Sequence, residues 1–149
     1  MRTFYVDTAR SITSKAGKKY WKCSVVENNQ NIINFANGKA FWAIEAEAYT
    51  ILATIYWLIE QKHQGVVIIY SDCKSLVDFK SFKKLSRKVE KSQKRLDTIN
   101  WKEKTKVISE TKAHYFINLV RSLAMKNNLD LELNWVKGKE NPADYYSRH

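Results

Sequence analysis

The order of apolar and polar residues along the chain predicts strands first and helices later. Runs rich in β-branched and aromatic residues predict strands over residues 3–7, Lys19–Glu27 and Gln30–Asn37, with a polar loop over residues 8–18. Asn28-Asn29 separates the second and third runs, and two asparagines suit the positive φ angles of a tight hairpin turn. We therefore expect three antiparallel strands at the start of the chain.

A helical period replaces the strand period after the third run. Apolar residues recur every three or four positions over residues 41–63, which is typical of an amphipathic helix that ends near Gly65. Residues 66–70 are apolar on both faces, which is typical of a buried parallel strand reached through a helical crossover. The spacing of apolar residues over residues 76–85 then predicts another helix.

The last third of the chain completes the pattern. It predicts a helix over residues 109–126, a strand over residues 129–136 and a short helix that begins at Asn141-Pro142. The order of elements predicts an α/β fold, with a five-stranded mixed sheet of three antiparallel and then two parallel strands, flanked by helices. With four glycines, one proline and no repeat, the chain shows no linker, and we expect one domain over residues 1–149.

Four acidic residues stand at positions where they could converge. Asp7 ends the first strand, and a carboxylate on a core strand must be paired, protonated or bound to a cation. Glu47 lies within the apolar stripe of the first helix, Asp72 follows the buried strand, and Asp144 lies in the first turn of the last helix. Glu45 lies about 200° around the helix from Glu47, so we expect it to face outward.

Each acid also has an ordinary structural interpretation that the sequence leaves open. Glu47 could stand at the flank of its helix with its carboxylate in solvent. Asp72 could serve as the N-cap of the following helix, and Asp144 could be a first-turn residue that stabilises the helix after Asn141.

Composition narrows the range of partners. The net charge of +11 predicts a polyanionic partner, either nucleic acid or an anionic membrane surface. Residues 80–106 hold eleven lysines and arginines against three acids, and apolar residues at intervals indicate a packed basic module. Cys23 and Cys73 form no disulfide or metal-ligand pattern, and the sequence shows no signal peptide or membrane span, so we expect a cytoplasmic or nuclear protein.

Several short motifs, taken together, resemble the ribonuclease H (type 1) family, and the C-terminal ones are most similar to the ribonuclease H domains of retroelement reverse transcriptases. The motifs are FYVD at residues 4–7, AEA at 46–48, IYSDC at 69–73, WVKG at 135–138, NPAD at 141–144 and SR at 147–148. The resemblance covers nearly the whole chain and has four acids in the family's order.

This resemblance implies a ribonuclease H-like fold and hydrolysis of the RNA strand of RNA/DNA hybrids by two Mg²⁺ ions, with Mn²⁺ able to substitute. The implied catalytic and metal-binding residues are Asp7, Glu47, Asp72 and Asp144. The implied nucleic-acid-binding residues are Lys83, Lys84, Arg87, Lys88, Lys91, Lys94, Arg95, Trp101 and Lys139. Lys139 stands where the family carries a mobile histidine. The implied protein is a monomer, working alone or beside a reverse transcriptase or replication machinery.

Two other functions fit the same sequence. One is a catalytically weak or inactive module that keeps the fold and binds nucleic acid, although a cluster of acids would repel a phosphate backbone. The other is a related nuclease that acts on DNA.

Overall fold

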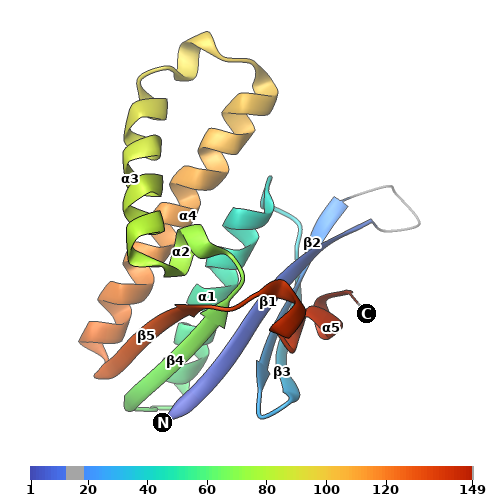
Figure 1. Cartoon of the computed structure of the whole chain (residues 1–149), viewed down its shortest axis with the longest axis vertical. Coiled ribbons are helices and arrows are strands. Elements are labelled where there is room, and N and C mark those ends of the chain that lie inside the picture. The colour runs from blue at the N-terminus through green and yellow to red at the C-terminus, as the bar shows by residue number, and fades with distance from the viewer. Residues whose placement is uncertain (13–18, 149) are drawn as a thin grey trace.

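The computed structural model describes residues 1–12 and 19–148, which form a five-stranded sheet with helices on both faces (Figure 1). The strands are β1 (Arg2–Ile12), β2 (Lys19–Glu27), β3 (Gln30–Asn37), β4 (Gly65–Ser71) and β5 (Leu129–Trp135). Their order in the sheet is β3-β2-β1-β4-β5. The β1–β2 and β2–β3 pairs are antiparallel, whereas the β1–β4 and β4–β5 pairs are parallel. The predicted five-stranded mixed sheet, with three antiparallel and then two parallel strands flanked by helices, is confirmed.

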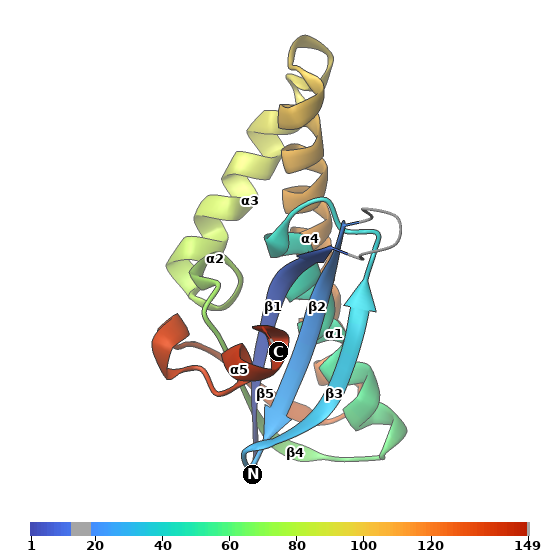
Figure 2. The same ribbon diagram turned by 90° about the vertical axis from the view of Figure 1, so that its right-hand side faces the viewer.

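The two faces of the sheet are covered by different helices. The helices are α1 (Ala43–Glu60), α2 (Lys74–Val77), α3 (Phe79–Gln93), α4 (Trp101–Lys126) and α5 (Ala143–Arg148), with 3-10 turns at η1 (Leu96–Thr98) and η2 (Gly138–Glu140). Helix α1 covers one face of the sheet, and the short α5 lies across β1 and β2 on the other (Figure 2). Helices α3 and α4 form a pair that projects beyond the sheet (Figure 1). None of the helices among the described residues has both the length and the apolar character needed to cross a membrane.

The core lies between α1 and the sheet, as the apolar stripe predicted. Ile51, Ile55 and Leu58 of α1 are fully buried, together with Phe4 and Val6 of β1. The hairpin between β2 and β3 is also confirmed, because Asn28 and Asn29 have φ angles of 53° and 61°.

The first strand is longer than predicted. Residues Asp7 to Ile12 pair with β2, from Asp7↔Ser24 to Ile12↔Lys19, so the predicted polar loop is wrong over residues 8–12. Antiparallel pairing satisfies the backbone groups of this polar stretch, which overrides its weak strand propensity. The rest of that predicted loop, residues 13–18, lies outside the described residues.

The helical segment after β4 is divided into α2 and α3. Asp78 has extended backbone angles between them, and its side chain accepts a hydrogen bond from the backbone N–H of Ser81 at 3.0 Å. Helix α4 begins at Trp101, earlier than predicted, because Asn100 caps it by accepting from the N–H of Glu103 at 2.9 Å. The basic module therefore consists of α3, η1 and the first turns of α4.

A split in the sheet creates the space for a site. Strand β1 pairs with β4 from Arg2↔Val67 to Tyr5↔Tyr70, whereas its pairing with β2 continues to Ile12↔Lys19. Beyond Tyr5 the two parallel strands therefore separate at their carboxyl ends. In open α/β sheets this is where ligands collect.

Candidate active site

Three acidic side chains from separate elements meet at the split. Asp7 comes from β1, Glu47 from α1 and Asp72 from the residue after β4, and their carboxylate oxygens lie within 4.8 Å of one another. Asp7 and Glu47 are each only 4% exposed. The structure thus brings together three of the four acids singled out in the sequence.

Asp144 lies beside this group but outside its tightest part. Its negative charge helps to raise the pKa values of Asp7 and Asp72, which places its carboxylate in the same electrostatic neighbourhood. Its Oδ1 atom accepts a hydrogen bond from Nε of Arg148 at 2.8 Å, one helical turn later. The interpretation of Asp144 as a first-turn residue of α5 is also correct, so the two interpretations do not compete.

Buried hydrogen bonds fix α5 against β1. The Nδ2 atom of Asn141 donates to the backbone oxygen of Val6 at 2.8 Å, and its Oδ1 atom accepts from the N–H of Ala143 at 3.0 Å. Ser147 donates from Oγ to Oδ2 of Asp7 at 2.8 Å. Asn141 and Ser147 thereby connect α5 to Asp7 and to the residue before it, a role that the sequence did not reveal.

Residues around the loop that follows β5 hold Asp72. Trp135 donates from Nε1 to the backbone oxygen of Asp72 at 3.3 Å, and Lys74 lies over the Trp135 ring with its Nζ atom 5.2 Å from the centroid. A β-carbon placed on Gly138 would lie 3.3 Å from Oδ2 of Asp72. The backbone therefore approaches the carboxylate closely, which suits a glycine.

The electrostatics of the cluster are unfavourable for three carboxylates. The pKa of Asp7 is raised to about 7, mainly by burial and in part by the charge of Asp72, while the hydrogen bond from Ser147 opposes both. Burial and then the charges of Asp7 and Asp72 raise the pKa of Glu47 well above its usual value. Burial and the charge of Asp144 raise the pKa of Asp72. The negative charge of the cluster is thus poorly compensated by the protein.

The donor set fits a hard divalent cation such as Mg²⁺. Among the described residues, none gives a hydrogen bond to the buried Oε1 atom of Glu47. A buried polar atom without a partner costs free energy that a ligand can recover. Asp7, Glu47 and Asp72 together offer the carboxylate oxygens that Mg²⁺ prefers.

Thiol chemistry is disfavoured at the same place. Asp7, Glu47, Asp72 and Cys73 line a cavity of about 320 Å³. Burial, with the charges of Glu47 and Asp72, raises the pKa of Cys73 to about 12. A thiol with such a pKa is neutral at pH 7 and is a poor nucleophile and metal ligand.

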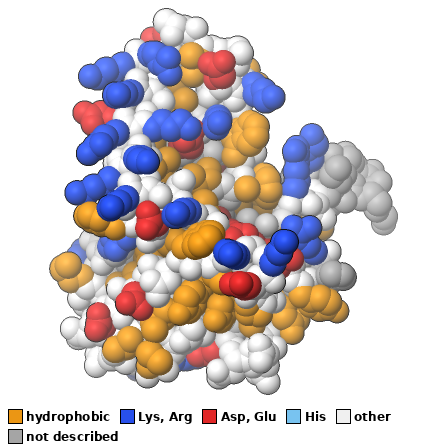
Figure 3. All heavy atoms as spheres, viewed as in Figure 1, with side chains coloured by type: hydrophobic (Ala, Val, Ile, Leu, Met, Phe, Trp, Pro, Cys, Tyr) orange, Lys and Arg blue, Asp and Glu red, His pale blue; other side chains and the backbone are white. Residues whose placement is uncertain are grey.

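The predicted cationic residues of the basic module lie on the surface. Lys83, Lys84, Arg87, Lys88, Lys91, Lys94 and Arg95 are all exposed. Figure 3 shows lysine and arginine side chains gathered along α3 and around the turn that leads into α4. Trp101 is 69% exposed and contacts the ring of Phe41 edge to face, with 6.1 Å between centroids.

Two of the predicted cationic residues differ from the others. Lys88 forms an ion pair with Glu110 at 2.9 Å, so part of its charge is compensated. Lys139 is exposed in η2, directly after Gly138, whose backbone approaches Asp72, so it does not belong to the basic module.

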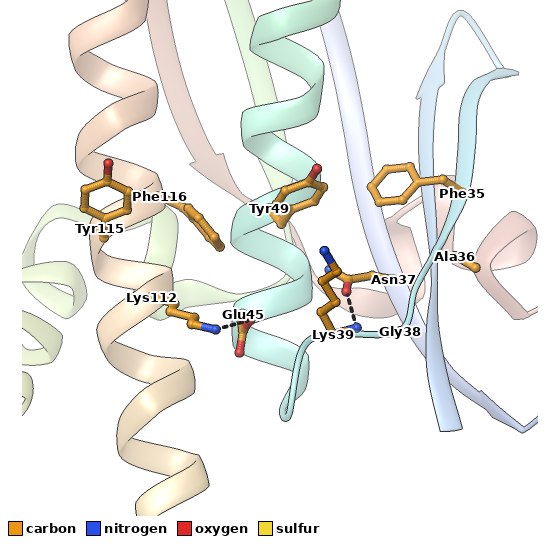
Figure 4. A pocket seen from close by; sticks show the side chains of 10 residues that line it. All are labelled: Phe35, Ala36, Asn37, Gly38, Lys39, Glu45, Tyr49, Lys112, Tyr115 and Phe116. Atoms are coloured by element: carbon orange, nitrogen blue, oxygen red, sulfur yellow. Dashed lines mark hydrogen bonds and ion pairs between the residues drawn. The ribbon is translucent and has the colours of Figure 1, made fainter. Parts of the chain in front are cut away.

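The expectation that Glu45 faces outward is wrong. Glu45 is 4% exposed, because α4 packs over this side of α1. Its Oε1 atom accepts from Oγ of Ser109 at 2.8 Å, and its Oε2 atom lies 3.8 Å from Nζ of Lys112. Figure 4 shows Glu45 pointing toward Lys112 at a cavity of about 530 Å³ whose aromatic residues include Tyr49 and Phe116. Glu45 therefore belongs to the contact between α1 and α4.

Comparisons with solved structures find ribonuclease H domains. The N-terminal ribonuclease H domain of a Mycobacterium tuberculosis protein, solved as a fusion with maltose-binding protein, is 13% identical over 95% of this chain and 92% of its own, with a TM-score of 0.47. Ribonuclease H1 of the halophilic archaeon Halobacterium salinarum is 12% identical over 95% of this chain and 89% of its own, also with a TM-score of 0.47. Neither a protein-family model nor a curated protein matches the sequence. Function is therefore inferred from the residues of this chain.

Glu47→Gln and Glu45→Gln should have different effects, because the two side chains lie in different environments. We expect Glu47→Gln to abolish the rise in Tm that Mn²⁺ or Mg²⁺ produces. Glu45→Gln should keep that rise and instead destabilise the fold by about 1 kcal/mol through weaker contacts with Ser109 and Lys112. Thermal melts with and without the cations measure both effects. Equal loss of the cation response in both variants would contradict this assignment.

Asp72→Asn should stabilise the cation-free protein, because it removes one of three repelling carboxylates. The expected rise in Tm is small, roughly 2 °C, since Asp72 is partly exposed and solvent screens its charge. Melts in a chelating buffer measure this. Asp130→Asn, at an exposed acid of β5, is the matched control and should leave Tm unchanged. A lower Tm for Asp72→Asn would show that the cluster does not strain the fold.

Proposed function

We propose that the chain is a divalent-cation-dependent endonuclease that hydrolyses the RNA strand of RNA/DNA hybrids. The observation that carries the proposal is the group of three carboxylates within 4.8 Å, with an unpartnered Glu47 oxygen, at the split between two parallel strands. Such a cluster is unfavourable without a cation, and a cation there would be open to a phosphate.

Four acids would bind the metal ions at this centre. Asp7, Glu47 and Asp72 would hold Mg²⁺ directly, and Asp144 would complete the set from α5. In a two-metal nuclease site, bound Mg²⁺ supplies activation of a water molecule and neutralisation of the charge that develops on the phosphate. Mn²⁺ prefers similar oxygen ligands and should substitute.

The neighbouring residues would keep these carboxylates in place. Ser147 donates to Asp7, Arg148 donates to Asp144, and Trp135 holds the backbone of Asp72. In this way a neighbouring residue orients each of the three aspartates, and each aspartate keeps at least one carboxylate oxygen that could bind Mg²⁺.

The basic module would bind the DNA strand of the hybrid. Its exposed cations lie on α3 and on the turn into α4, which projects beyond the sheet. Trp101 would add an aromatic contact, and Lys139 a phosphate contact nearer the acids. A hybrid has near A-form geometry and carries 2′-hydroxyls on one strand, so an enzyme can distinguish the strands without reading bases.

A substrate panel tests the reaction. With Mg²⁺, the protein should cleave the RNA of a matched hybrid and leave double-stranded RNA and double-stranded DNA of the same sequence intact. Asp72→Asn should reduce cleavage of the hybrid to below about 1% of the unmodified rate, because a metal ligand is worth several kcal/mol of stabilisation. Gel analysis of end-labelled strands gives both results. Cleavage of DNA would favour the related DNA nuclease, and tight binding without cleavage would favour the inactive module.

The salt dependence of binding tests the basic module. If about four of its cations contact phosphates, log affinity should fall with log salt concentration at a slope of about −3 to −4. Replacing Lys83, Lys84, Arg87 and Lys91 by glutamine should flatten this slope and raise KM more than it lowers kcat. Titrations of a labelled hybrid at several salt concentrations measure the slope. An unchanged slope would place the nucleic acid elsewhere.

A further inference from the structure

A second cavity opens beside the acidic cluster and is lined by positive charge. It has a volume of about 630 Å³ and is formed by β1, β2 and α5. Three cations line it from three elements, namely Arg10 of β1, Lys22 of β2 and Arg148 of α5. None of the described residues that line it is acidic. We name this cavity the β1–β2–α5 pocket.

Hydroxyl groups accompany the cations in the pocket. Thr8, Ser11, Tyr20 and Ser147 all contribute to its lining. The register of β1 and β2 places Tyr20 opposite Ser11 and Lys22 opposite Ala9. Side chains that lie opposite one another in a strand pair share a face of the sheet, so Ser11, Tyr20 and Lys22 lie on one face. Thr8 and Arg10 lie opposite Cys23 and Trp21 on the alternate face, and they line the pocket from β1, beyond the point where β1 stops pairing with β4.

The pocket adjoins the acidic cluster through shared residues. Thr8 lines both the β1–β2–α5 pocket and the cavity that holds Asp7, Glu47 and Asp72. Ser147 lines the pocket and also donates to Oδ2 of Asp7. Arg10 is three residues beyond Asp7, about 10 Å along the strand. Figure 2 shows α5 lying across β1 and β2, and Ser147 and Arg148 of this helix line the pocket.

We propose that the β1–β2–α5 pocket binds a backbone phosphate of the RNA strand, next to the phosphate at the acidic cluster. The proposal rests on the proposed function and adds to it a second contact on the strand that is cut. An arginine fork and a lysine match the geometry and charge of a phosphate, and hydroxyls add neutral donors. Contacts of this kind fix the register of a strand without reading its sequence. The pocket would thus determine which linkage reaches the acids.

The test uses binding in a chelating buffer, so it does not depend on cleavage. Arg10→Gln with Lys22→Gln removes two cations, while Arg148 is kept because it also pairs with Asp144. The probe is a duplex of DNA and 2′-O-methyl RNA, followed by fluorescence anisotropy. We expect the double variant to bind about five- to tenfold more weakly, with the salt slope reduced by about 1.

The matched control removes the same charge elsewhere. Lys62 follows α1 and Lys126 ends α4, both at the opposite end of the sheet from the carboxyl ends of β1 and β4 (Figure 1). Lys62→Gln with Lys126→Gln should leave affinity and salt slope within about twofold of the unmodified protein. An equal loss in both double variants would reflect net charge alone and would overturn the proposal.

A scan of neutral linkages then locates the phosphate. One methylphosphonate at a time replaces a phosphate in the 2′-O-methyl strand, and each duplex is titrated with the unmodified protein and the double variant. At one linkage the unmodified protein should lose affinity by about the same factor as the mutations cause, and the double variant should lose no more. Additive losses at every position, or coupling only to the DNA strand, would overturn the proposal. If one RNA-strand linkage and the two mutations have non-additive effects but the protein cleaves no hybrid, the pocket is supported and the nuclease function is overturned.

Discussion

The burial of negative charge at the split between β1 and β4 is the constraint on which the rest of the site depends. Asp7, Glu47 and Asp72 lie within 4.8 Å of one another, and burial together with mutual repulsion raises all three pKa values. Packing of α1 against the sheet holds Glu47 there, since Ile51 and Ile55 on the same helix are fully buried. The free energy of the core thus maintains an arrangement that is locally unfavourable, as is common at functional sites.

Hydrogen bonds from α5 and the residues just before it hold β1 in place at Val6 and Asp7. The hydrogen bond from Asn141 to Val6 and the one from Ser147 to Asp7 connect α5 to β1. A six-residue helix has little stability of its own, so these buried contacts decide where α5 lies. The position of Asp144 therefore depends on them.

Sequence patterns predicted most of the fold because its elements follow simple periods. β2 and β3 were predicted with the observed bounds, since the strand pattern and the asparagine turn agree. The extension of β1 to Ile12 could not be predicted, because pairing with β2 stabilises a polar stretch with no apolar alternation. The start of α4 at Trp101 was missed for a related reason. The first turns of α4, which Asn100 caps, are rich in lysine, so they show no clear apolar stripe in the sequence.

Asp7, Glu47 and Asp72 were found in the sequence because each stands at the end of a strand or within an apolar stripe, where a charge is unexpected. Glu45 shows the limit of that reasoning. Helical geometry correctly separated it from Glu47, but the sequence could not show that α4 would cover that side of α1. The β1–β2–α5 pocket was missed because Arg10 and Lys22 fall in ordinary polar stretches, and only the fold brings both to a cavity that α5 also lines.

Positive charge lies on two sides of the acidic cluster. Cations of the basic module lie on the projecting α3 and α4, whereas Arg10, Lys22 and Arg148 lie on the far side of the acids, over β1, β2 and α5. A polyanion attracted to both positive surfaces must cross the acidic cluster between them, where the carboxylates alone would repel it. A bound cation reverses that local repulsion. The same charges that make the cluster unfavourable by itself would thus make a nucleic acid bind across it more tightly with a metal ion than without one.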